Sequence, residues 1–228
     1  MTDQARQPVP PLLPAGARRP AAVLVLCCAA VITVGALAAA GRSRGSGPDN
    51  AVDSWIIGHL GSHYTLLRPV ADIGGGIATA VLAAALVIGC LLVRRVNGAL
   101  LALISAVLAS VVTEAVLKPL VHETIGSPPA LTYPSGHTTD VVTIATVIVV
   151  LLLNPPRGRP GRPALVAIPV LVALISCAVA VSLIAIRWHY FTDTVAGAAV
   201  GIAVVLLTAL ALDVPAIRLR LPTASSRS

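Results

Sequence analysis

Six long apolar runs constrain this chain more than any other feature of its sequence. In order, they cover Ala21–Ala40, Val70–Val93, Asn97–Leu117, Ser135–Leu153, Ala164–Ile186 and Phe191–Leu212. A helix needs roughly 20 apolar residues to cross the hydrocarbon core of a membrane, and each run is close to that length. We therefore predict an all-α integral membrane bundle of six transmembrane helices. This domain, residues 21–212, stands between a disordered tail at 1–20, rich in Pro, Ala and Arg, and a second short basic tail at 213–228.

The composition excludes the main soluble alternatives. Of the 228 residues, 57% are hydrophobic and only 11% are charged, whereas the surface of a soluble domain needs far more charge. The net charge of +7 does not indicate nucleic-acid binding, because the arginines stand in short clusters between apolar runs, where they set membrane orientation. Aromatic residues make up 3% of the chain, which leaves no stacking platform for single-stranded nucleic acid. We expect no nucleic-acid partner.

The basic residues are divided unequally between the two sets of connections. One set holds eleven, namely Arg6, Arg18, Arg19, Arg94, Arg95, Arg157, Arg159, Arg162, Arg218, Arg220 and Arg227. The other set holds five, namely Arg42, Arg44, Arg68, Lys118 and Arg187. Because cytoplasmic loops carry the excess of Lys and Arg, we predict a plasma-membrane protein with both termini cytoplasmic. The connections 41–69, 118–134 and 187–190 then lie on the outer side.

The first apolar run has an alternative interpretation as a cleaved signal peptide. Arg18-Arg19 precede it, and Ala38-Ala39-Ala40 stand near its end. The topology of the remaining runs is the same under either interpretation.

The outer connection 41–69 carries a helical pattern of its own. Apolar and aromatic side chains recur on one face, at Val52, Trp55, Ile56, His59, Leu60 and Leu67. We predict a short amphipathic helix, capped by Asn50, that lies on the outer leaflet. An ordinary folded loop is the alternative.

Small residues inside the runs indicate packing. Gly197 and Gly201 form a GxxxG pair, and Gly74-Gly75-Gly76 stand in the second run; we interpret both sets as points of close helix contact. The cysteines, which we interpret as small buried apolar residues, show no metal-binding spacing. They are Cys27, Cys28, Cys90 and Cys177.

All five histidines and the single lysine fall on the outer side. They are His59, His63, His122, His137, His189 and Lys118. We expect three outer-edge clusters to meet: Lys118 at the end of the third run, residues 133–137 (Tyr-Pro-Ser-Gly-His) at the start of the fourth, and residues 187–193 (Arg-Trp-His-Tyr-Phe-Thr-Asp) at the start of the sixth. Polar groups at one depth of an apolar bundle are costly unless they form a site.

The spacing of two residues predicts an activated nucleophile. His189 and Asp193 are four residues apart, so on a helix they share one face. A carboxylate there holds one imidazole nitrogen protonated and leaves the other free to attack phosphorus.

The other polar residues suit the binding and departure of a phosphate. Ser135 and Gly136 open a helix, whose backbone N–H groups and positive dipole end form an anion site. His137 follows at once and is placed to protonate a departing alkoxide. Lys118 and Arg187 supply the positive charge that a phosphoryl transition state requires.

Each cluster also has a plainer interpretation. A His and an Asp near a helix end can form an interfacial hydrogen-bonded pair, Ser135-Gly136 can be a simple helix start, and Lys118 can be a snorkelling residue paired with Glu114. A metal site is a further alternative, built from His122, His137, His189 and Asp193. Their spacing matches no known ligand motif, so we expect no metal and no cofactor.

The pattern resembles the type 2 phosphatidic acid phosphatase superfamily, which also includes the vanadium haloperoxidases. That family carries a Lys followed after six residues by Arg-Pro, then Pro-Ser-Gly-His, then Ser-Arg, five residues, His, three residues and Asp. Here Pro134-Ser135-Gly136-His137 matches the second motif, His189 and Asp193 match the end of the third, and Lys118 matches the start of the first. The resemblance spans about residues 50–212 and includes the six-helix layout.

The resemblance implies a role for each matching residue. His189 is the expected nucleophile, which becomes phosphohistidine, Asp193 orients it, and His137 is the general acid. The phosphate is expected to be bound, without a metal, by an arginine together with Lys118, Ser135 and Gly136.

Two departures from the family pattern remove its arginines. Ile125 and Gly126 stand where the first motif has Arg-Pro, and Leu183 stands where the third has Arg. Arg187, one helical turn beyond Leu183, and Arg68, at the outer mouth of the second run, are the candidates to replace the missing charge.

These observations lead to three functional hypotheses. The leading one is a metal-independent lipid phosphate phosphatase that hydrolyses a phosphomonoester, such as phosphatidic acid or a phosphorylated polyprenyl lipid, at the outer membrane face. The second is a polyprenyl diphosphate phosphatase, an acid anhydride hydrolase that serves cell-wall carrier recycling. The third is a non-catalytic lipid-binding or transport protein with a decayed site. A haloperoxidase is disfavoured, because a site embedded in lipid suits lipid headgroups better than soluble halides.

Overall fold

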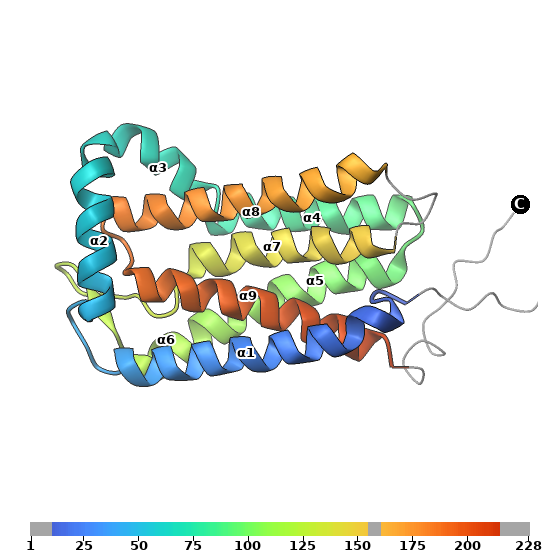
Figure 1. The fold of residues 1–228 in the computed structure, drawn as a ribbon, viewed down its shortest axis with the longest axis horizontal. Helices are drawn as coiled ribbons and strands as arrows, with labels where there is room; N and C mark the ends of the chain where they lie inside the picture. The colour runs from blue at the N-terminus through green and yellow to red at the C-terminus, as the bar shows by residue number, and fades with distance from the viewer. Residues whose placement is uncertain (1–10, 155–160, 215–228) are drawn as a thin grey trace, which may run out of the picture.

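The computed structural model describes residues 11–154 and 161–214, and its main feature is a bundle of six long helices (Figure 1). The helices are α1 (Ala15–Ala39), α4 (Gly76–Leu92), α5 (Val96–Ser110), α7 (Gly136–Leu153), α8 (Arg162–Ala185) and α9 (Phe191–Leu212). Helix α5 continues through a π-helical segment, Val111–Leu117, into the short α6, Lys118–Val121. Six candidate spans in the described residues are long and apolar enough to cross a membrane, which confirms the predicted fold class.

The six predicted runs correspond to these helices, with shifted boundaries at the N-terminal end. Residues 11–20, predicted as part of a disordered tail, are ordered here: Leu12 and Leu13 are buried, and α1 begins at Ala15. Their backbone N–H groups donate to the Asp213 carboxylate at 2.8 and 2.9 Å. Residues 1–10 and 215–228, the rest of the predicted tails, lie outside the described residues.

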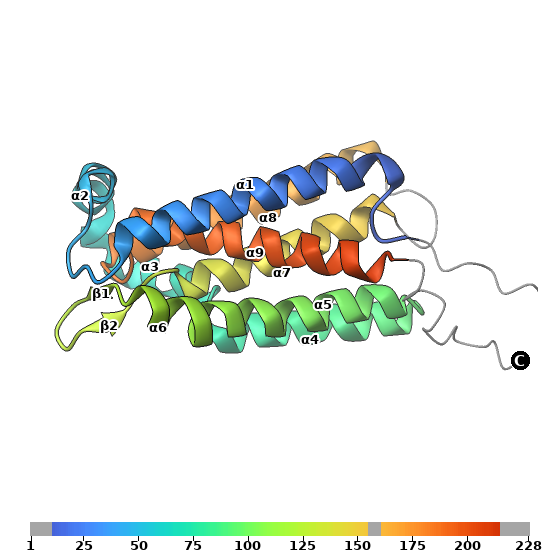
Figure 2. The ribbon, with the colours of Figure 1, turned by 90° about the horizontal axis from the view of Figure 1, so that it is seen from below.

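Helices α7 and α9 form the centre of the bundle, and small residues set their close approach. A Cβ atom added at Gly197 would lie 2.5 Å from the carbonyl oxygen of Ser135, and one at Gly201 would lie 2.8 Å from that of Thr139. The GxxxG pair is therefore a packing contact, as predicted. A Cβ atom added at Gly74 would likewise lie 2.6 Å from the carbonyl oxygen of His137. Figure 2 shows α4 and α5 on one side of this centre and α1 on the other.

The outside of the bundle is apolar. Large hydrophobic side chains are exposed along the long helices, for example Leu26, Ile77, Leu92 and Leu174, as expected where the surroundings are lipid. The interpretation of all four cysteines as buried is wrong for two of them, because Cys27 and Cys177 are exposed on this apolar surface.

One end of the bundle carries the histidines and is covered by shorter elements; we call it the histidine end. Here α2 (Gly47–Leu60), a 3-10 turn (Gly61–His63) and α3 (Tyr64–Asp72) connect α1 to α4, and α2 crosses the helix ends (Figure 1). A helix is therefore present in 41–69, as predicted, but it ends at Leu60, and Leu67 of the predicted face lies on α3. The cap of α2 is Ser46 rather than Asn50, because Ser46 and Asp49 form a reciprocal capping box.

A small hairpin completes the histidine end. Strands β1 (Thr124–Ile125) and β2 (Ala130–Leu131) pair antiparallel, with Thr124 opposite Leu131. Gly126 follows β1 with φ +82°. Proline is fixed near −65° and cannot adopt this conformation, so the hairpin and the family's Arg-Pro are incompatible at this point.

Candidate active site

Ser135 and Gly136 stand at the start of α7, where the sequence predicts a helix start. Ser135 is the buried N-cap of α7, and its Oγ accepts from the Thr138 N–H at 3.4 Å and from the Thr138 hydroxyl at 3.1 Å. The Ser135 N–H donates to the Asp193 carbonyl of α9 at 3.1 Å. The preceding Tyr133 is fully buried, and its hydroxyl donates to the Ile32 carbonyl of α1 at 2.7 Å. The start of α7 is thus fixed by two other long helices.

His189 and Asp193 make the predicted contact at the start of α9. His189 lies in the connection before α9 rather than on the helix, since α9 begins at Phe191. Its Nδ1 still lies 3.3 Å from Asp193 Oδ2, which also accepts from the Tyr190 N–H at 3.0 Å. Asp193 is fully buried and His189 is 8% exposed. In the tautomer that donates from Nδ1, the His189 Nε2 carries the free lone pair.

The environment of His189 favours its neutral form. Burial, together with the positive charge of Lys118, lowers the pKa of His189 to about 3. An imidazole that stays neutral at physiological pH is a competent nucleophile.

His137, in the first turn of α7, and His189, in the connection before α9, lie close together. Their ring centroids are 6.5 Å apart. The Trp188 ring packs edge-on against His137 at 5.8 Å, and the Arg68 guanidinium lies over Trp188, 4.5 Å from its ring. Arg68 also contacts Asp72 at 3.1 Å. A guanidinium from α3 therefore stands at the rim of the site.

Lys118 is held beside the start of α7 by an acidic partner. Its Nζ lies 2.7 Å from Glu114 Oε1, the ion pair that the plainer interpretation of Lys118 includes. A Cβ atom at Gly136 would lie 2.5 Å from the same carboxylate oxygen and 3.7 Å from Lys118 Nζ. The Glu114 carboxylate thus lies against the start of α7, and the absence of a side chain at Gly136 allows this approach.

Arg187 is a proposed site residue whose side chain does not reach the others in the described structure. Its side chain is exposed and its backbone has φ +61°. Its backbone N–H donates to the Ile184 carbonyl at 2.9 Å, but within residues 11–154 and 161–214 its side chain makes no hydrogen bond or ion pair. Leu183, at the family's arginine position, is fully buried among Val141, Val142 and Val179, so an apolar core contact replaces that charge.

The structure adds carboxylates that the sequence pattern did not reveal. Asp49 and Asp53 of α2 are buried and accept from the first N–H groups of α9, Asp49 from Thr192 at 2.9 Å and Asp53 from Phe191 at 3.1 Å. They fix the start of α9, and hence Asp193, from a segment about 140 residues away. Sequence reasoning missed them because such a partner has no local signal.

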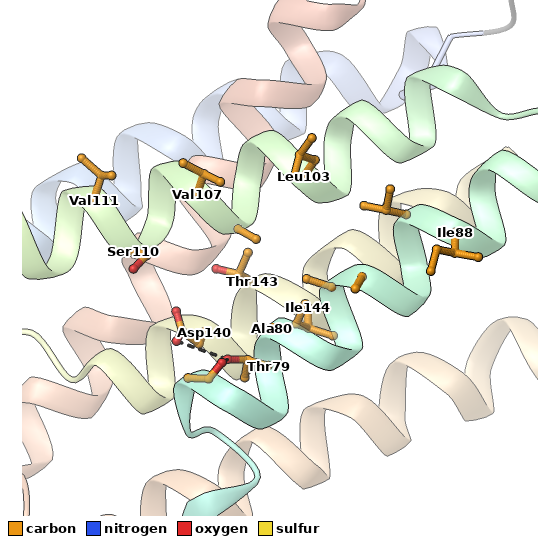
Figure 3. A pocket seen from close by; sticks show the side chains of 15 residues that line it. Thr79, Ala80, Ile88, Leu103, Val107, Ser110, Val111, Asp140, Thr143 and Ile144 are labelled. Carbon is orange, nitrogen blue, oxygen red and sulfur yellow. Dashed lines mark hydrogen bonds between the residues drawn. The ribbon is translucent and has the colours of Figure 1, made fainter.

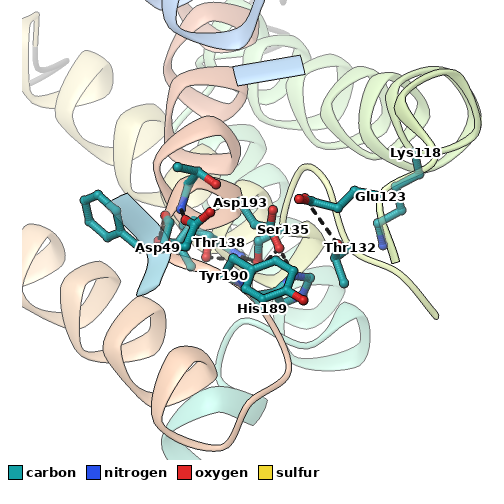
Figure 4. Close-up of polar contacts among 12 residues, drawn as sticks. Asp49, Lys118, Glu123, Thr132, Ser135, Thr138, His189, Tyr190 and Asp193 are labelled. Carbon is teal, nitrogen blue, oxygen red and sulfur yellow. Dashed lines mark hydrogen bonds and ion pairs between the residues drawn. The ribbon is translucent and has the colours of Figure 1, made fainter. Parts of the chain in front are cut away.

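Glu123 is the third carboxylate that sequence reasoning missed. It precedes β1 and is 2% exposed. Its Oε2 accepts from the Thr132 hydroxyl at 3.4 Å, and its side chain lies within hydrogen-bonding reach of Asp193 (Figure 4). In the sequence it is an acidic residue within the first motif, between Lys118 and Ile125.

An apolar cavity of about 600 Å³ lies between α4, α5 and α7. Figure 3 shows Thr79, Ser110 and Asp140 at one end and Leu103 and Ile88 toward the other. Asp140 accepts from the Thr79 hydroxyl at 3.4 Å and lies one helical turn beyond His137 on α7. The cavity therefore begins near the histidine end and extends along the helices.

Comparison with known families agrees with the motifs. The sequence profile of the PAP2 superfamily matches residues 99–214, about half of the chain. The chain belongs to the PAP2 superfamily. The search of curated proteins finds no match. A solved structure, the first transmembrane PAP2 type phosphatidylglycerolphosphate phosphatase from Bacillus subtilis, is similar with a TM-score of 0.59 and 16% identity, over 83% of this chain and 95% of that one. This likeness supports the shared fold.

Membership of the PAP2 superfamily establishes the general class of this chain. With six helices able to cross a membrane, it is a multi-pass membrane protein of a phosphatase family. Among the described residues, no three His, Cys, Asp or Glu side chains are arranged to hold a metal ion.

Proposed function

We propose that this PAP2 protein is a lipid phosphate phosphatase that hydrolyses a phosphomonoester through a phosphohistidine, without a metal, at the outer membrane face. The observation that carries the proposal is the pair of facing imidazoles, His137 and His189, 6.5 Å apart, with Asp193 behind one of them. Beside them stand the N-terminus of α7 and the ammonium of Lys118. A phosphoryl group placed between the rings meets a nucleophile on one side and an acid on the other.

The first chemical step forms a P–N bond and breaks a P–O bond. His189 Nε2 attacks phosphorus while Nδ1–H is held by Asp193, whose charge stabilises the imidazolium as it forms. The electrons of the breaking bond go to the lipid oxygen, which takes the proton of His137. A water molecule then attacks the phosphohistidine with His137 as its base, and His189 and inorganic phosphate are released.

Binding of the phosphate requires one rearrangement. The Glu114 carboxylate lies against Gly136 and Lys118, where the phosphate oxygens are expected. Because the phosphate carries more charge than a carboxylate, it displaces Glu114 and binds the Lys118 ammonium and the N–H groups at the start of α7. Glu114 is half exposed, so its movement costs little packing.

The cavity between α4, α5 and α7 suits the hydrocarbon chain of the substrate. Its lining is apolar toward Leu103 and Ile88, and its polar end lies one turn from His137. A chain there places the headgroup at the histidine end. A soluble phosphate would gain nothing from this cavity.

Phosphate release from a panel of lipids tests the proposal. The purified protein in detergent should hydrolyse lipid monophosphates in the presence of a chelator and should be inhibited by vanadate, which mimics five-coordinate phosphorus. Activity restricted to polyprenyl diphosphates would favour the carrier-recycling alternative. Binding without turnover would favour a decayed site, and activity lost to chelator and restored by a divalent metal would contradict the metal-free mechanism.

A further inference from the structure

The second oxygen of the Asp193 carboxylate has an unusual environment. Oδ2 accepts from His189 and Tyr190, but Oδ1 is fully buried and receives no hydrogen bond from an N–H or hydroxyl group in the described ranges. A buried carboxylate oxygen without a donor costs roughly 1–3 kcal/mol or more. The side chain within reach of Asp193 is another carboxyl group, that of Glu123.

Two carboxyl groups can share a hydrogen bond only if one of them carries a proton. Glu123 is the group placed to carry it. It is 2% exposed, and its Oε2 accepts from Thr132, so its other oxygen is free to hold the proton. Asp193, in contrast, accepts from the backbone N–H of Tyr190 and from His189, which both favour its ionised form.

We propose that Glu123 is a positioning residue, whose protonated carboxyl group donates a hydrogen bond to Asp193 and so orients the carboxylate that holds His189. Glu123 then donates to Asp193, which accepts from His189, so the three side chains form one chain of hydrogen bonds. Glu123 and Asp193 are 70 residues apart in the sequence. This inference rests on the proposed role of His189 as the nucleophile.

The charges around Glu123 favour its protonated form. Burial is the largest cause and, with the Asp193 carboxyl, raises the pKa of Glu123 to about 9. The groups that face it are the acid Asp49 of α2, Asp193 of α9, and the phenols Tyr133 and Tyr190. None of these is a cation. Glu123 is therefore neutral at physiological pH and ionises only in alkaline solution, where its charge would repel Asp193.

Two substitutions separate this role from simple packing. In Glu123→Gln the amide N–H replaces the carboxyl O–H as donor to Asp193 at every pH, so turnover near neutral pH should stay close to that of the wild type. In Glu123→Leu the donor is lost while most of the volume remains, so kcat should fall about 10- to 100-fold, the range for losing a hydrogen bond to a charged group. KM should change little, because Glu123 does not touch the substrate.

The pH profile supplies the decisive contrast. The wild type should lose kcat as the pH rises past about 9, where Glu123 ionises, and Glu123→Gln should not share this loss. Equal loss of turnover in the Gln and Leu variants, full activity of the Leu variant, or the same alkaline limb in the wild type and Glu123→Gln would overturn the proposal. If Glu123→Leu fails to fold, the comparison of the wild type with Glu123→Gln still decides.

Infrared spectroscopy tests the shared proton without any turnover. At neutral pH the wild type should show the C=O stretch of a protonated carboxylic acid, which is absent from the spectrum of Glu123→Gln. Glu114→Gln is the matched control, since Glu114 is half exposed and paired with Lys118, and its loss should leave that band in place. If the protein hydrolyses no phosphate, the proposed function fails, whereas absence of the band in the wild type overturns the role of Glu123.

Discussion

We assign different chemical roles to His137 and His189, and substrates with different leaving groups test this assignment. His189→Ala should abolish the first step for every substrate. His137→Ala should retain attack but leave an unprotonated alkoxide, so a nitrophenyl phosphate, whose leaving group is already acidic, should largely restore its activity. Asp193→Asn should resemble a weakened His189 variant. The measurement is turnover of a lipid phosphate and a nitrophenyl phosphate by each variant.

A rapid quench supplies the control for these roles. Acid-labile, base-stable phosphate should be trapped on the wild-type protein and be absent from His189→Ala. Equal rescue of both histidine variants, or trapped phosphate on His189→Ala, would show that the roles are wrongly assigned even if the protein is a phosphatase.

The cations at the rim lead to a second prediction at the residue scale. With Ile125 and Leu183 in place of the family's arginines, we expect Arg187→Ala to lower kcat/KM at least about 100-fold, as for the loss of one transition-state contact. This requires Arg187, exposed in this structure, to turn toward the phosphate. Arg68→Ala is the comparison, because Arg68 already lies over Trp188 beside His137. If Arg187→Ala has a mild effect and Arg68→Ala a steep one, the positive charge that stabilises the transition state comes from Arg68 of α3 and not from Arg187.

The site residues that the sequence predicted are those that belong to short motifs. Ser135, Gly136 and His137 are consecutive, and His189 and Asp193 are four residues apart, so their geometry is local. Glu123 acts on a residue 70 positions away, and only the fold brings the two together. Asp49 and Asp53 of α2 were not predicted for the same reason, because they cap α9, which begins far along the chain.

At the scale of helices, the contact between α7 and α9 sets the distance between the two halves of the site. Gly197→Ala would place a methyl group 2.5 Å from the Ser135 carbonyl, so α7 must shift at its N-terminal end. We expect a lower melting temperature and a loss of phosphatase activity larger than the loss of helix content explains. The matched control is Gly89→Ala on α4, where a Cβ meets nothing within 4 Å, and which should be neutral or stabilising. Equal behaviour of the two variants would contradict this packing role.

The helices themselves were predictable because a membrane span requires a long apolar run, whatever its neighbours. Their ends were less so. Helix α1 extends six residues before the predicted start, Ala21, because Leu12 and Leu13 are tied to the Asp213 carboxylate at the far end of the chain. The π-helical segment before Lys118 also lacks a sequence signal, although such segments often occur at functional sites.

For the whole molecule, the structure places all the proposed catalytic groups at one end of the bundle. The termini of the described chain, the α4–α5 connection and the end of α7 lie at the other end (Figure 1). Our expectation of which end faces outward rests on the basic residues of the connections. Because the proposed site lies at one end, the unequal number of basic residues at the two ends predicts the side of the membrane from which the substrate reaches it.

We expect the histidine end to be extracytoplasmic, because eleven of the sixteen basic residues belong to the other set of connections. In a background without native cysteines, Ala130→Cys in the hairpin should react with an impermeant thiol reagent added to intact cells. Gly158→Cys, in the connection between α7 and α8, should react only after the cells are opened. Labelling in permeabilised cells controls for the reactivity of each position. The reverse pattern would place the site in the cytoplasm, and the substrate would then have to come from the inner leaflet.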